Sequence, residues 1–283
     1  MILLEKEPLS KHTSYRAGGV AKYFILPETD EELIKSLEFC HKHGDFYIIG
    51  RGSNVLFSDR FYDGTVVSLE NYNNFQIVKD NFLRCGGGVL LWDAVTFSME
   101  NGLGGMENLS GIPGSVGGAV FMNAGAFGTE VSDVVYSLKT ITYKGEAVFR
   151  ICDRSFFSYR SSKLKDEIVS EVTFKLDKNH FDLKKSVDVL KKRKEKQPLE
   201  YPSCGSVFKR PKDNFAGTLI ESCGLKGFGF GNAVVSEKHA NFIVNRGGSS
   251  AEDIYKTIKY VKDTVFKNTG ILLEEEVKLI NFF

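Results

Sequence analysis

Apolar positions at the start of the chain predict a strand, a helix and a second strand, over 21–26, 29–43 and 46–49. Short apolar runs of about four to eight residues are typical of buried strands. In the helix, Leu33, Leu37 and Cys40 recur at helical spacing, Thr29 begins a capping box and Gly44 ends the helix. We therefore predict a β-α-β unit whose second strand runs straight into a glycine turn.

The middle of the chain shows short strand patterns around one helix, which predicts strands 65–69, 75–78, 82–85, 134–143, 147–151 and 167–176 and helix 89–101. The alternation from 134 to 176, with a turn at Gly145, is typical of antiparallel strands. On the helix we expect an apolar side that consists of Leu90, Ala94, Phe97 and Met99.

Two helices and a strand complete the pattern. Asp182 caps the first helix, which places Leu183, Val187 and Leu190 on one face and ends before Pro198. The second helix, 250–268, has a capping box and an apolar stripe of Ile254, Ile258, Val261 and Val265. Residues 271–283 read as a final strand. The predicted fold class is α+β with mixed sheets.

Composition narrows the class of protein. The 283 residues carry a net charge of +1, which favours neither nucleic acid nor an acidic membrane as partner. The start of the chain does not resemble a signal peptide, and no apolar run approaches the roughly 20 residues that span a bilayer. The five cysteines form no CxxC pair and are odd in number. We expect a cytoplasmic protein with reduced thiols and no membrane insertion.

Common catalytic signatures are absent. The sequence holds no phosphate-binding GxxxxGK[ST] loop, no HExxH zinc motif and no GxSxG nucleophile motif. The five histidines show no ligand spacing, so we expect no metal site.

Two glycine-rich segments remain. Residues 50–54 read GRGSN directly after a strand, and such a turn can gather main-chain amides into an anion-binding concavity. Alone, this pentapeptide is more typical of an ordinary turn. Residues 102–128 hold nine glycines among apolar residues, unlike a flexible linker. Together the two segments indicate a long dinucleotide bound through main-chain amides.

Motifs along the whole chain identify it as resembling the UDP-N-acetylenolpyruvoylglucosamine reductase family. They are TSYRAGG at 13–19, IGRGSN at 49–54, the segment 111–128, YRSS at 159–162, QP at 197–198, GSVFKRP at 205–211, AGTLIE at 216–221, GLKG at 224–227, KHANF at 238–242 and GILLEEEV at 270–277. The resemblance implies a vanillyl-alcohol-oxidase-type (PCMH-type) FAD fold of two subdomains, 1–64 and 65–180. A substrate-binding α+β domain, 181–270, and a C-terminal strand, 271–283, follow.

The resemblance also implies non-covalent FAD, with NADPH as hydride-donating co-substrate. The residues expected to contact FAD are Tyr15, Arg16, Gly50, Arg51, Gly52, Ser53, Asn54, Gly111, Ile112, Pro113, Gly114, Ser115, Gly117, Gly118, Ala119, Ala124 and Gly125.

The implied activity reduces the enolpyruvyl ether of UDP-N-acetylglucosamine to UDP-N-acetylmuramate in peptidoglycan synthesis. Hydride leaves flavin N5, and charge then develops beside the substrate carboxylate. By the resemblance, Arg160 holds that carboxylate, Ser206 donates the proton and Glu276 assists. Alternation along a strand would place Glu274 and Glu276 on one face and Glu275 on the other.

Substrate contacts are expected from Lys209, Lys226 and Asn241, with Tyr201 a further candidate. The 46 positions from Arg160 to Ser206 are too few for the lid insertion of longer family members, so the chain resembles the shorter class. Cys204 is interpreted as a buried thiol, with an oxidation-sensitive site as the alternative. We expect a monomer.

Two other functions stay open on sequence alone. One is a flavin oxidoreductase with a different substrate, which would lack the pair Ser206 and Glu276. The other is a non-catalytic nucleotide-sugar binding module, which would lack flavin colour.

Overall fold

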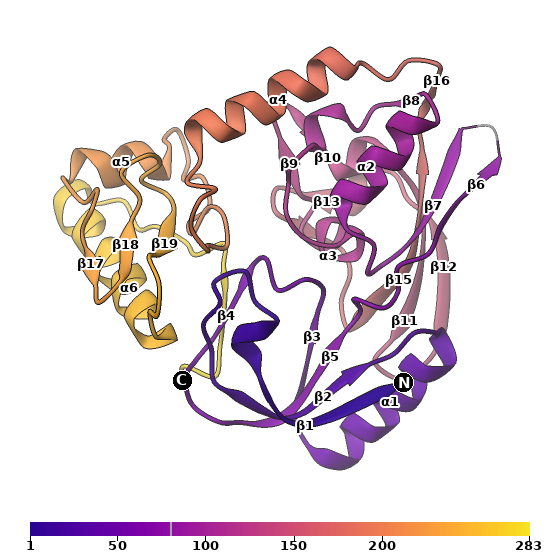
Figure 1. Ribbon diagram of the computed structural model, residues 1–283, viewed down its shortest axis with the longest axis horizontal. Helices are drawn as coiled ribbons and strands as arrows, with labels where there is room; N and C mark the ends of the chain where they lie inside the picture. Colours follow the sequence, from indigo (N-terminus) through magenta and orange to yellow (C-terminus); the bar gives the residue numbers. More distant parts are fainter. Residues whose placement is uncertain (80) are drawn as a thin grey trace. The chain divides into compact units, whose positions relative to one another are not determined.

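The computed structural model describes residues 1–79 and 81–283. The chain forms two compact units (Figure 1). Unit 1 comprises residues 1–5, 23–51 and 63–192, and unit 2 comprises residues 6–22, 52–62 and 193–283. The domain division predicted from the sequence, at 64, 180 and 270, is a functional one and stays a prediction.

A four-stranded sheet with the order β1-β2-β5-β3 contains the predicted β-α-β unit. Its strands are β1 (Ile2–Pro8), β2 (Val20–Leu26), β5 (Tyr62–Ser68) and β3 (Phe46–Ile49), and β3 pairs parallel with β5. Helix α1 (Asp30–His43) lies between β2 and β3 in sequence. Leu33, Leu37 and Cys40 are buried as predicted, and Thr29 Oγ1 accepts a hydrogen bond from the Glu32 amide.

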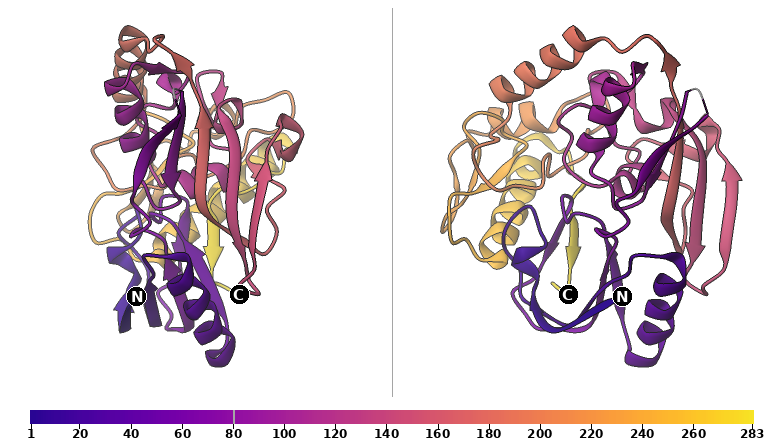
Figure 2. Two further views of the ribbon diagram at one scale, coloured as in Figure 1. Left: turned by 90° about the vertical axis from the view of Figure 1, so that its right-hand side faces the viewer. Right: turned by 45° about the vertical axis from the view of Figure 1, so that its right-hand side comes forward.

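Unit 1 is built around a five-stranded antiparallel sheet with the order β12-β11-β15-β7-β6 (Figure 2). The strands are β6 (Phe75–Lys79), β7 (Phe82–Gly86), β11 (Val135–Thr142), β12 (Ala147–Ile151) and β15 (Glu167–Lys175). Helices α2 (Leu91–Glu100) and α3 (Val116–Phe121) share one apolar core with β7, β11 and β15. The antiparallel pattern predicted for 134–176 is therefore confirmed.

The predicted apolar side of α2 is partly wrong. Ala94 is buried as expected, but Met99 is 36% exposed, and the inward face also carries Val95 and Ser98. The helix begins at Leu91 rather than 89, and its buried residues are Leu91, Ala94, Val95 and Ser98. The Ser98 hydroxyl donates to the Val95 main-chain oxygen (2.8 Å), so a polar residue occupies an inward position that an apolar pattern does not show.

The stripe predicted on α4 (Leu183–Lys196) is also wrong. Leu183 and Val187 are more than half exposed, whereas Ser186 and Val189 are buried. The Ser186 hydroxyl lies 2.7 Å from the Ser110 hydroxyl in a buried hydrogen bond. A polar residue with a buried partner can occupy an inward position, which hydrophobic periodicity does not detect.

Unit 2 contains helices α5 (Ala216–Ser222) and α6 (Ala251–Thr269) and a three-stranded antiparallel sheet of β17 (Gly229–Phe230), β18 (Ala233–Val235) and β19 (Ile243–Asn245). The capping box at Ser250 and the buried stripe of Ile254, Ile258, Val261 and Val265 are confirmed. The sequence pattern did not predict α3, α5 or the strands β17 to β19.

The final strand is shorter than predicted. Only β20 (Lys278–Ile280) is a strand, and it pairs parallel with β4 (Val55–Phe57). Upstream, the chain makes an isolated antiparallel bridge between Glu275 and Phe208. The segment changes partner between these two contacts, which interrupts the ladder.

Shorter elements complete the chain. These are β8 (Leu103–Gly104), β9 (Gly125–Ala126), β10 (Thr129–Glu130), β13 (Phe157–Ser158), β14 (Ser161–Ser162) and β16 (Asp177–Lys178), with 3₁₀ turns η1 (Leu9–Lys11), η2 (Glu107–Leu109), η3 (Val131–Asp133) and η4 (Arg154–Phe156).

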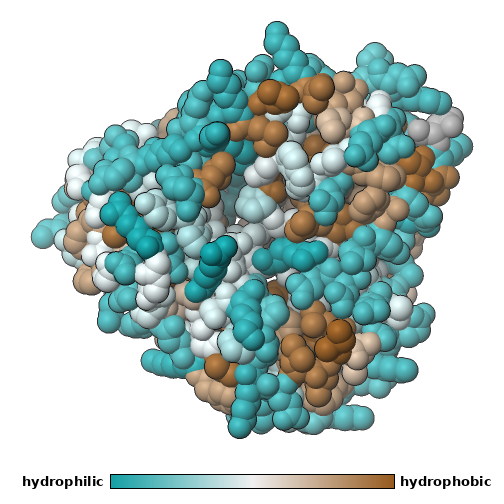
Figure 3. Space-filling model, viewed as in Figure 1, coloured by the Kyte–Doolittle hydropathy of each residue, from teal (hydrophilic) through white to brown (hydrophobic). Residues whose placement is uncertain are grey.

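The surface shown in Figure 3 is mainly hydrophilic, with several small hydrophobic patches. Among the described residues, every helix is too short or too polar to span a lipid bilayer.

Candidate active site

The two glycine segments meet inside unit 1 at Gly50 and Ser115. A Cβ built on Gly50 would lie 2.1 Å from Ser115 Oγ, so no side chain fits at position 50. Ser115 caps α3, because its Oγ accepts a hydrogen bond from the Gly118 amide (3.3 Å). Gly111 and Gly114 both have positive φ, a conformation that favours glycine. The close approach of these turns agrees with the predicted use of glycine.

Main-chain amides at this meeting point are available for a ligand. Within residues 1–79 and 81–283, the amides of Gly50, Arg51, Gly114 and Ser115 donate no hydrogen bond to another protein atom. Buried or half-buried amides usually have a partner. Their gathering in one place fits an anionic group such as the pyrophosphate of a dinucleotide.

The Arg51 side chain is directed to protein partners in unit 1. Its Nε donates to the main-chain oxygen of Gly88 (3.4 Å), and its Nη2 donates to the main-chain oxygen of Glu70 (3.4 Å). Its Nη1 lies 3.6 Å from the Glu70 carboxylate. Any contact of Arg51 with a ligand is therefore expected from its main chain.

Other residues predicted to contact the cofactor have structural roles. Ile112 and Ala119 pack in the apolar core of unit 1, and Gly117 donates its amide to the Gly87 oxygen (2.8 Å). In unit 2, Tyr15 is fully buried, and burial raises the pKa of its hydroxyl. A Cβ on Gly52 would lie 1.9 Å from the His12 oxygen.

Arg160 lies in the two-residue turn of the β13–β14 hairpin, with a left-handed φ of 55°. Its Nη2 donates to the Gly125 oxygen (3.3 Å), and its guanidinium stands 5.0 Å from the centre of the Tyr159 ring. The Asn123 amide group also donates to the Ser158 oxygen (3.1 Å). The hairpin is therefore fixed to the glycine-rich segment.

Ser206 and Glu276 lie on two hydrogen-bonded segments of unit 2. The Glu276 amide donates to the Val207 oxygen (2.8 Å), and the Lys209 amide donates to the Glu274 oxygen (2.8 Å). Ser206, which directly precedes Val207, is therefore close along the backbone to Glu276. Both residues are partly exposed.

The three adjacent glutamates differ in their partners. Glu274 forms an ion pair with Lys209, and both Glu275 carboxylate oxygens lie 2.8 Å from Lys262 Nζ. Neither ion pair involves Glu276. Glu274 and Glu275 thus have different partners, but the segment forms only an isolated bridge here, so the alternation that would place Glu276 with Glu274 stays a prediction.

The remaining predicted substrate residues also have protein partners in unit 2. Lys226 Nζ lies 2.6 Å from a Glu221 carboxylate oxygen. Near this lysine, burial lowers the pKa of His239, whose Nδ1 accepts a hydrogen bond from the Asn241 amide (3.2 Å). The Asn241 side chain is 8% exposed and binds the main chain of Phe208.

Cys204 is buried, and burial raises the pKa of its thiol to about 12. Its Sγ lies 3.4 Å from the Val55 oxygen. Since the reactive form of cysteine is an exposed thiolate, these properties favour the buried thiol over the oxidation-sensitive site.

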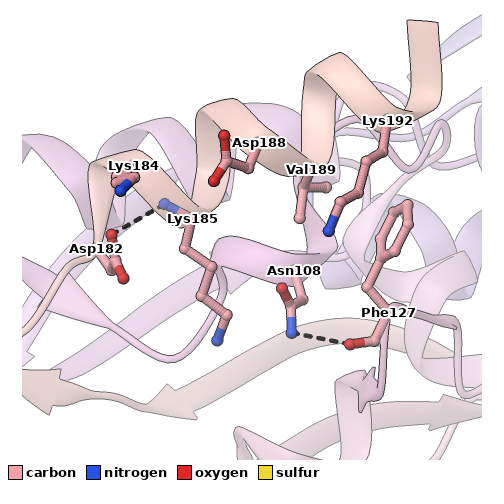
Figure 4. Close-up of a pocket in the computed structure, with 8 residues that line it drawn as sticks. All are labelled: Asn108, Phe127, Asp182, Lys184, Lys185, Asp188, Val189 and Lys192. Carbon is pink, nitrogen blue, oxygen red and sulfur yellow. Dashed lines mark hydrogen bonds between the residues drawn. The ribbon is translucent and has the colours of Figure 1, made fainter. Parts of the chain in front are cut away.

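A recess of about 450 Å³ in unit 1 was not predicted from the sequence (Figure 4). Lys185, Val189 and Lys192 lie on the side of α4 that faces Asn108 and Phe127. Asn108 Nδ2 donates to the Phe127 oxygen (3.1 Å), which fixes the amide at the floor of the recess. The spacing of the two lysines on one helix face was a signal in the sequence, but their partners were not.

Among the described residues, no three histidine, cysteine, aspartate or glutamate side chains gather as a ligand set for a metal.

Comparisons with known proteins cover nearly the whole chain. Residues 197–280 match the family model described as UDP-N-acetylenolpyruvoylglucosamine reductase, C-terminal domain, and residues 21–149 match the FAD binding domain. A protein from Caldicellulosiruptor saccharolyticus named UDP-N-acetylenolpyruvoylglucosamine reductase is 40% identical, over 99% of this chain and 92% of that protein. A protein of the same name from Clostridium botulinum is 41% identical, over 98% and 92%.

A solved structure extends this similarity to the fold. The crystal structure of UDP-N-acetylenolpyruvylglucosamine reductase from Thermus caldophilus superposes with a TM-score of 0.84 at 31% identity, over 99% of this chain and 98% of that one. With the two domain matches, this confirms the predicted fold class, a PCMH-type FAD-binding fold followed by a C-terminal α+β domain. The chain belongs to the UDP-N-acetylenolpyruvoylglucosamine reductase family.

Proposed function

We infer that this chain is an FAD-dependent oxidoreductase that uses NADPH to reduce the enolpyruvyl ether of UDP-N-acetylglucosamine to UDP-N-acetylmuramate, a step of peptidoglycan synthesis. The observation that carries this inference is the identity of about 40% with reductases of that name along nearly the full chain. We further propose that it acts as a monomer. We also propose that it acts in the cytoplasm, in keeping with its five free cysteines.

For the cofactor, we propose that the amides of Gly50, Arg51, Gly114 and Ser115 hold the FAD pyrophosphate, because they are unpaired within the described chain and adjacent. The other residues proposed to contact the cofactor are Tyr15, Arg16, Gly52, Ser53, Asn54, Gly111, Ile112, Pro113, Gly117, Gly118, Ala119, Ala124 and Gly125. When bound, FAD accepts hydride from NADPH and passes it to the β-carbon of the enolpyruvyl group.

Arg160 is proposed to bind the substrate carboxylate. Hydride addition leaves negative charge on the α-carbon and the carboxylate, so a fixed cation there stabilises the transition state more than the ground state. The planar guanidinium donates to both carboxylate oxygens at once. The link from Arg160 to Gly125 supports this role, since it holds the arginine near the predicted flavin segment.

Ser206 is proposed to give its hydroxyl proton to the α-carbon. Glu276 is proposed to polarise this hydroxyl and to help return a proton to it after the transfer. A serine hydroxyl is a poor acid in water, so this role needs a fixed geometry and a partner. The hydrogen bond between the Glu276 amide and the Val207 oxygen supports the pairing.

For the sugar nucleotide, we propose that Lys209 and Lys226 bind the substrate, within the proposed domain 181–270. Asn241 lies in the same domain, but its side-chain amide is engaged by the main chain of Phe208. Lys209 and Lys226 each form an ion pair with a glutamate, and substrate phosphates would compete for these ammonium groups.

The recess beside α4 is proposed to receive a phosphate group of one of the two nucleotides. Three lysines, Lys184, Lys185 and Lys192, outnumber the two carboxylates of the lining, Asp182 and Asp188 (Figure 4). Asn108 adds an amide, and Phe127 adds an aromatic surface for a planar ring.

Optical spectroscopy of the purified protein tests the function directly. We expect a yellow protein whose flavin absorbance bleaches with NADPH under anaerobic conditions and returns on addition of the enolpyruvyl sugar nucleotide. A colourless protein would support a non-catalytic binding module. Bleaching by NADPH without recovery would support a flavin oxidoreductase that acts on another substrate.

A further inference from the structure

We propose that Asn241 and Asn54 are positioning residues that hold the backbone of Ser206 and Glu276 in one fixed register. This inference rests on the roles proposed above for Ser206 and Glu276. It gives Asn54 and Asn241, which resemblance alone placed at the cofactor and the substrate, a role in proton transfer. All four residues belong to unit 2.

Asn241 binds the segment that follows Ser206 through three hydrogen bonds. Its main-chain oxygen accepts from the Val207 amide (2.8 Å), its Oδ1 accepts from the Phe208 amide (3.0 Å), and its Nδ2 donates to the Phe208 oxygen (2.9 Å). The side chain is buried, and both ends of its amide are engaged. This geometry suits an anchor of the main chain better than a contact with uridine.

Asn54 binds the other segment at Glu276. Its Nδ2 donates to the Glu276 oxygen (3.1 Å), and its main-chain oxygen accepts from the Lys278 amide (3.0 Å). Since the Glu276 amide donates to the Val207 oxygen, the hydrogen bonds form one continuous path. The path begins at Asn241, crosses Val207 and Glu276, and ends at Asn54.

The path fixes both proton-transfer residues from opposite sides. The Asn241 side chain holds Phe208, two residues after Ser206, and the Asn54 side chain holds the main chain of Glu276. A misplacement of about 1 Å at a reacting group can cost on the order of 10²-fold in rate. Removal of either amide should therefore slow the proton-coupled step without changing the groups that bind the nucleotide.

The test is Asn241→Ala, compared with wild type in the two half-reactions by stopped-flow absorbance. We expect reoxidation of the reduced flavin at saturating enolpyruvyl substrate to slow by on the order of 10²-fold. Substrate affinity, measured by titration of the oxidised protein, and flavin reduction by NADPH should stay within about threefold. Asn54→Ala is the second variant, since Asn54 is partly exposed and its removal disturbs the core less.

Asn245→Ala is the matched control. Asn245 is also buried, and its Nδ2 donates to the main-chain oxygen of Tyr15 (2.9 Å), while its Oδ1 accepts from the Gly247 amide (2.9 Å). The variant thus loses a comparable buried amide away from the path, and we expect reoxidation at the wild-type rate.

Three results would overturn the proposal. One is weaker substrate binding with unchanged reoxidation in Asn241→Ala, which would make Asn241 a substrate contact. Another is an equal slowing in Asn245→Ala, which would indicate general destabilisation. The third is a normal reoxidation rate in both Asn54→Ala and Asn241→Ala. A wild-type protein that the substrate does not reoxidise would instead contradict the proposed function, so the two failures are distinguishable.

Discussion

At the scale of single residues, the chemistry depends on weak groups made effective by their surroundings. A serine hydroxyl donates a proton poorly in water, so Ser206 depends on its neighbours. The backbone contact of Val207 with Glu276 supplies one neighbour, and the Asn241 hydrogen bonds to the next residue keep the segment rigid. The function of Ser206 therefore depends on fixed geometry more than on its own acidity.

Ser206→Ala should keep FAD bound and reducible by NADPH, while flavin reoxidation by the enolpyruvyl substrate slows by roughly 10²- to 10⁴-fold, because the proton donor is lost. Stopped-flow traces of the separate half-reactions measure both rates. Ser203→Ala, a partly exposed serine three residues away, is the control and should behave as wild type. Unchanged reoxidation in Ser206→Ala would remove Ser206 from the mechanism.

Arg160→Lys should lower kcat/KM for the enolpyruvyl substrate by roughly 10- to 100-fold, although the charge is retained. An ammonium lacks the planar fork that donates to two carboxylate oxygens, and hydrogen bonds to charged groups contribute about 1.5–3 kcal/mol. Steady-state kinetics measure the effect. The control is Arg154→Lys, an exposed arginine paired with Asp133. Wild-type turnover in Arg160→Lys would reassign Arg160 to the hairpin structure.

At the same scale, motifs located single residues but not their contacts. Resemblance selected Ser206 and Glu276, and the backbone indeed joins their segments. The hydrogen bond from Asn54 to Glu276, however, links residues 222 positions apart. No pattern in a single sequence indicates such a pairing, because the two residues meet only after segments far apart in the chain have paired in the correct register.

At the scale of elements, apolar periodicity and capping residues predicted a helix face correctly where the buried face is entirely apolar. They predicted it wrongly where a buried polar residue has a hydrogen-bond partner. Helix α6 has a capping box and an uninterrupted apolar stripe, and both were predicted. On α4, buried Ser186 has a hydroxyl partner in Ser110, so the inward face is not the most apolar one. Helix α3, only six residues long and rich in glycine, was missed since its sequence has little intrinsic helical preference.

Ser250→Ala should lower the free energy of unfolding by about 1 kcal/mol, because the Ser250 hydroxyl accepts the Asp253 amide (3.0 Å) and no methyl group can replace it. Urea unfolding followed by circular dichroism measures the change. Ser161→Ala, an exposed serine in β14, should differ from wild type by less than about 0.5 kcal/mol. Equal stability of the two variants would mean that the cap contributes little to α6.

At the scale of the whole molecule, the net charge of +1 is too small for charge repulsion to dominate the pH dependence of stability. That dependence then rests on single titratable groups whose pKa changes on folding. Burial lowers the pKa of His239 below its ordinary value, so the unfolded chain binds this proton at a higher pH than the folded chain. Stability that comes from neutral His239 is therefore complete above about pH 6.5 and is lost as the pH falls through the lowered pKa.

His239→Gln should flatten the decrease in unfolding free energy as the pH falls below about 6.5, because the proton that the unfolded chain binds more strongly is removed. Urea unfolding at a series of pH values measures the slope. His180→Gln, at an exposed position, should retain the wild-type slope. An unchanged slope in His239→Gln would show that other groups dominate the acid response.

The recess beside α4 is lined by that helix and by Asn108 and Phe127 of the glycine-rich segment, and its lysines outnumber its carboxylates by one (Figure 4). Lys185 and Lys192 are exposed, so their hydrated ammonium groups can exchange water for a phosphate oxygen. Loss of both charges should weaken binding of a phosphate-bearing ligand by more than tenfold, since each charged hydrogen bond contributes about 1.5–3 kcal/mol.

The double variant Lys185→Gln/Lys192→Gln tests this, with Lys191→Gln on the exposed side of α4 as a control for charge. If the recess holds the 2′-phosphate of NADPH, the concentration of NADPH that half-saturates flavin reduction rises, whereas that of NADH is unchanged. If it holds the sugar nucleotide, the concentration that half-saturates reoxidation rises instead. In either case the affected binding step should depend less on salt concentration in the double variant than in wild type, because two of the charges that salt screens have been removed. Equal behaviour of the double variant and wild type in all three measurements would exclude the recess as a nucleotide site.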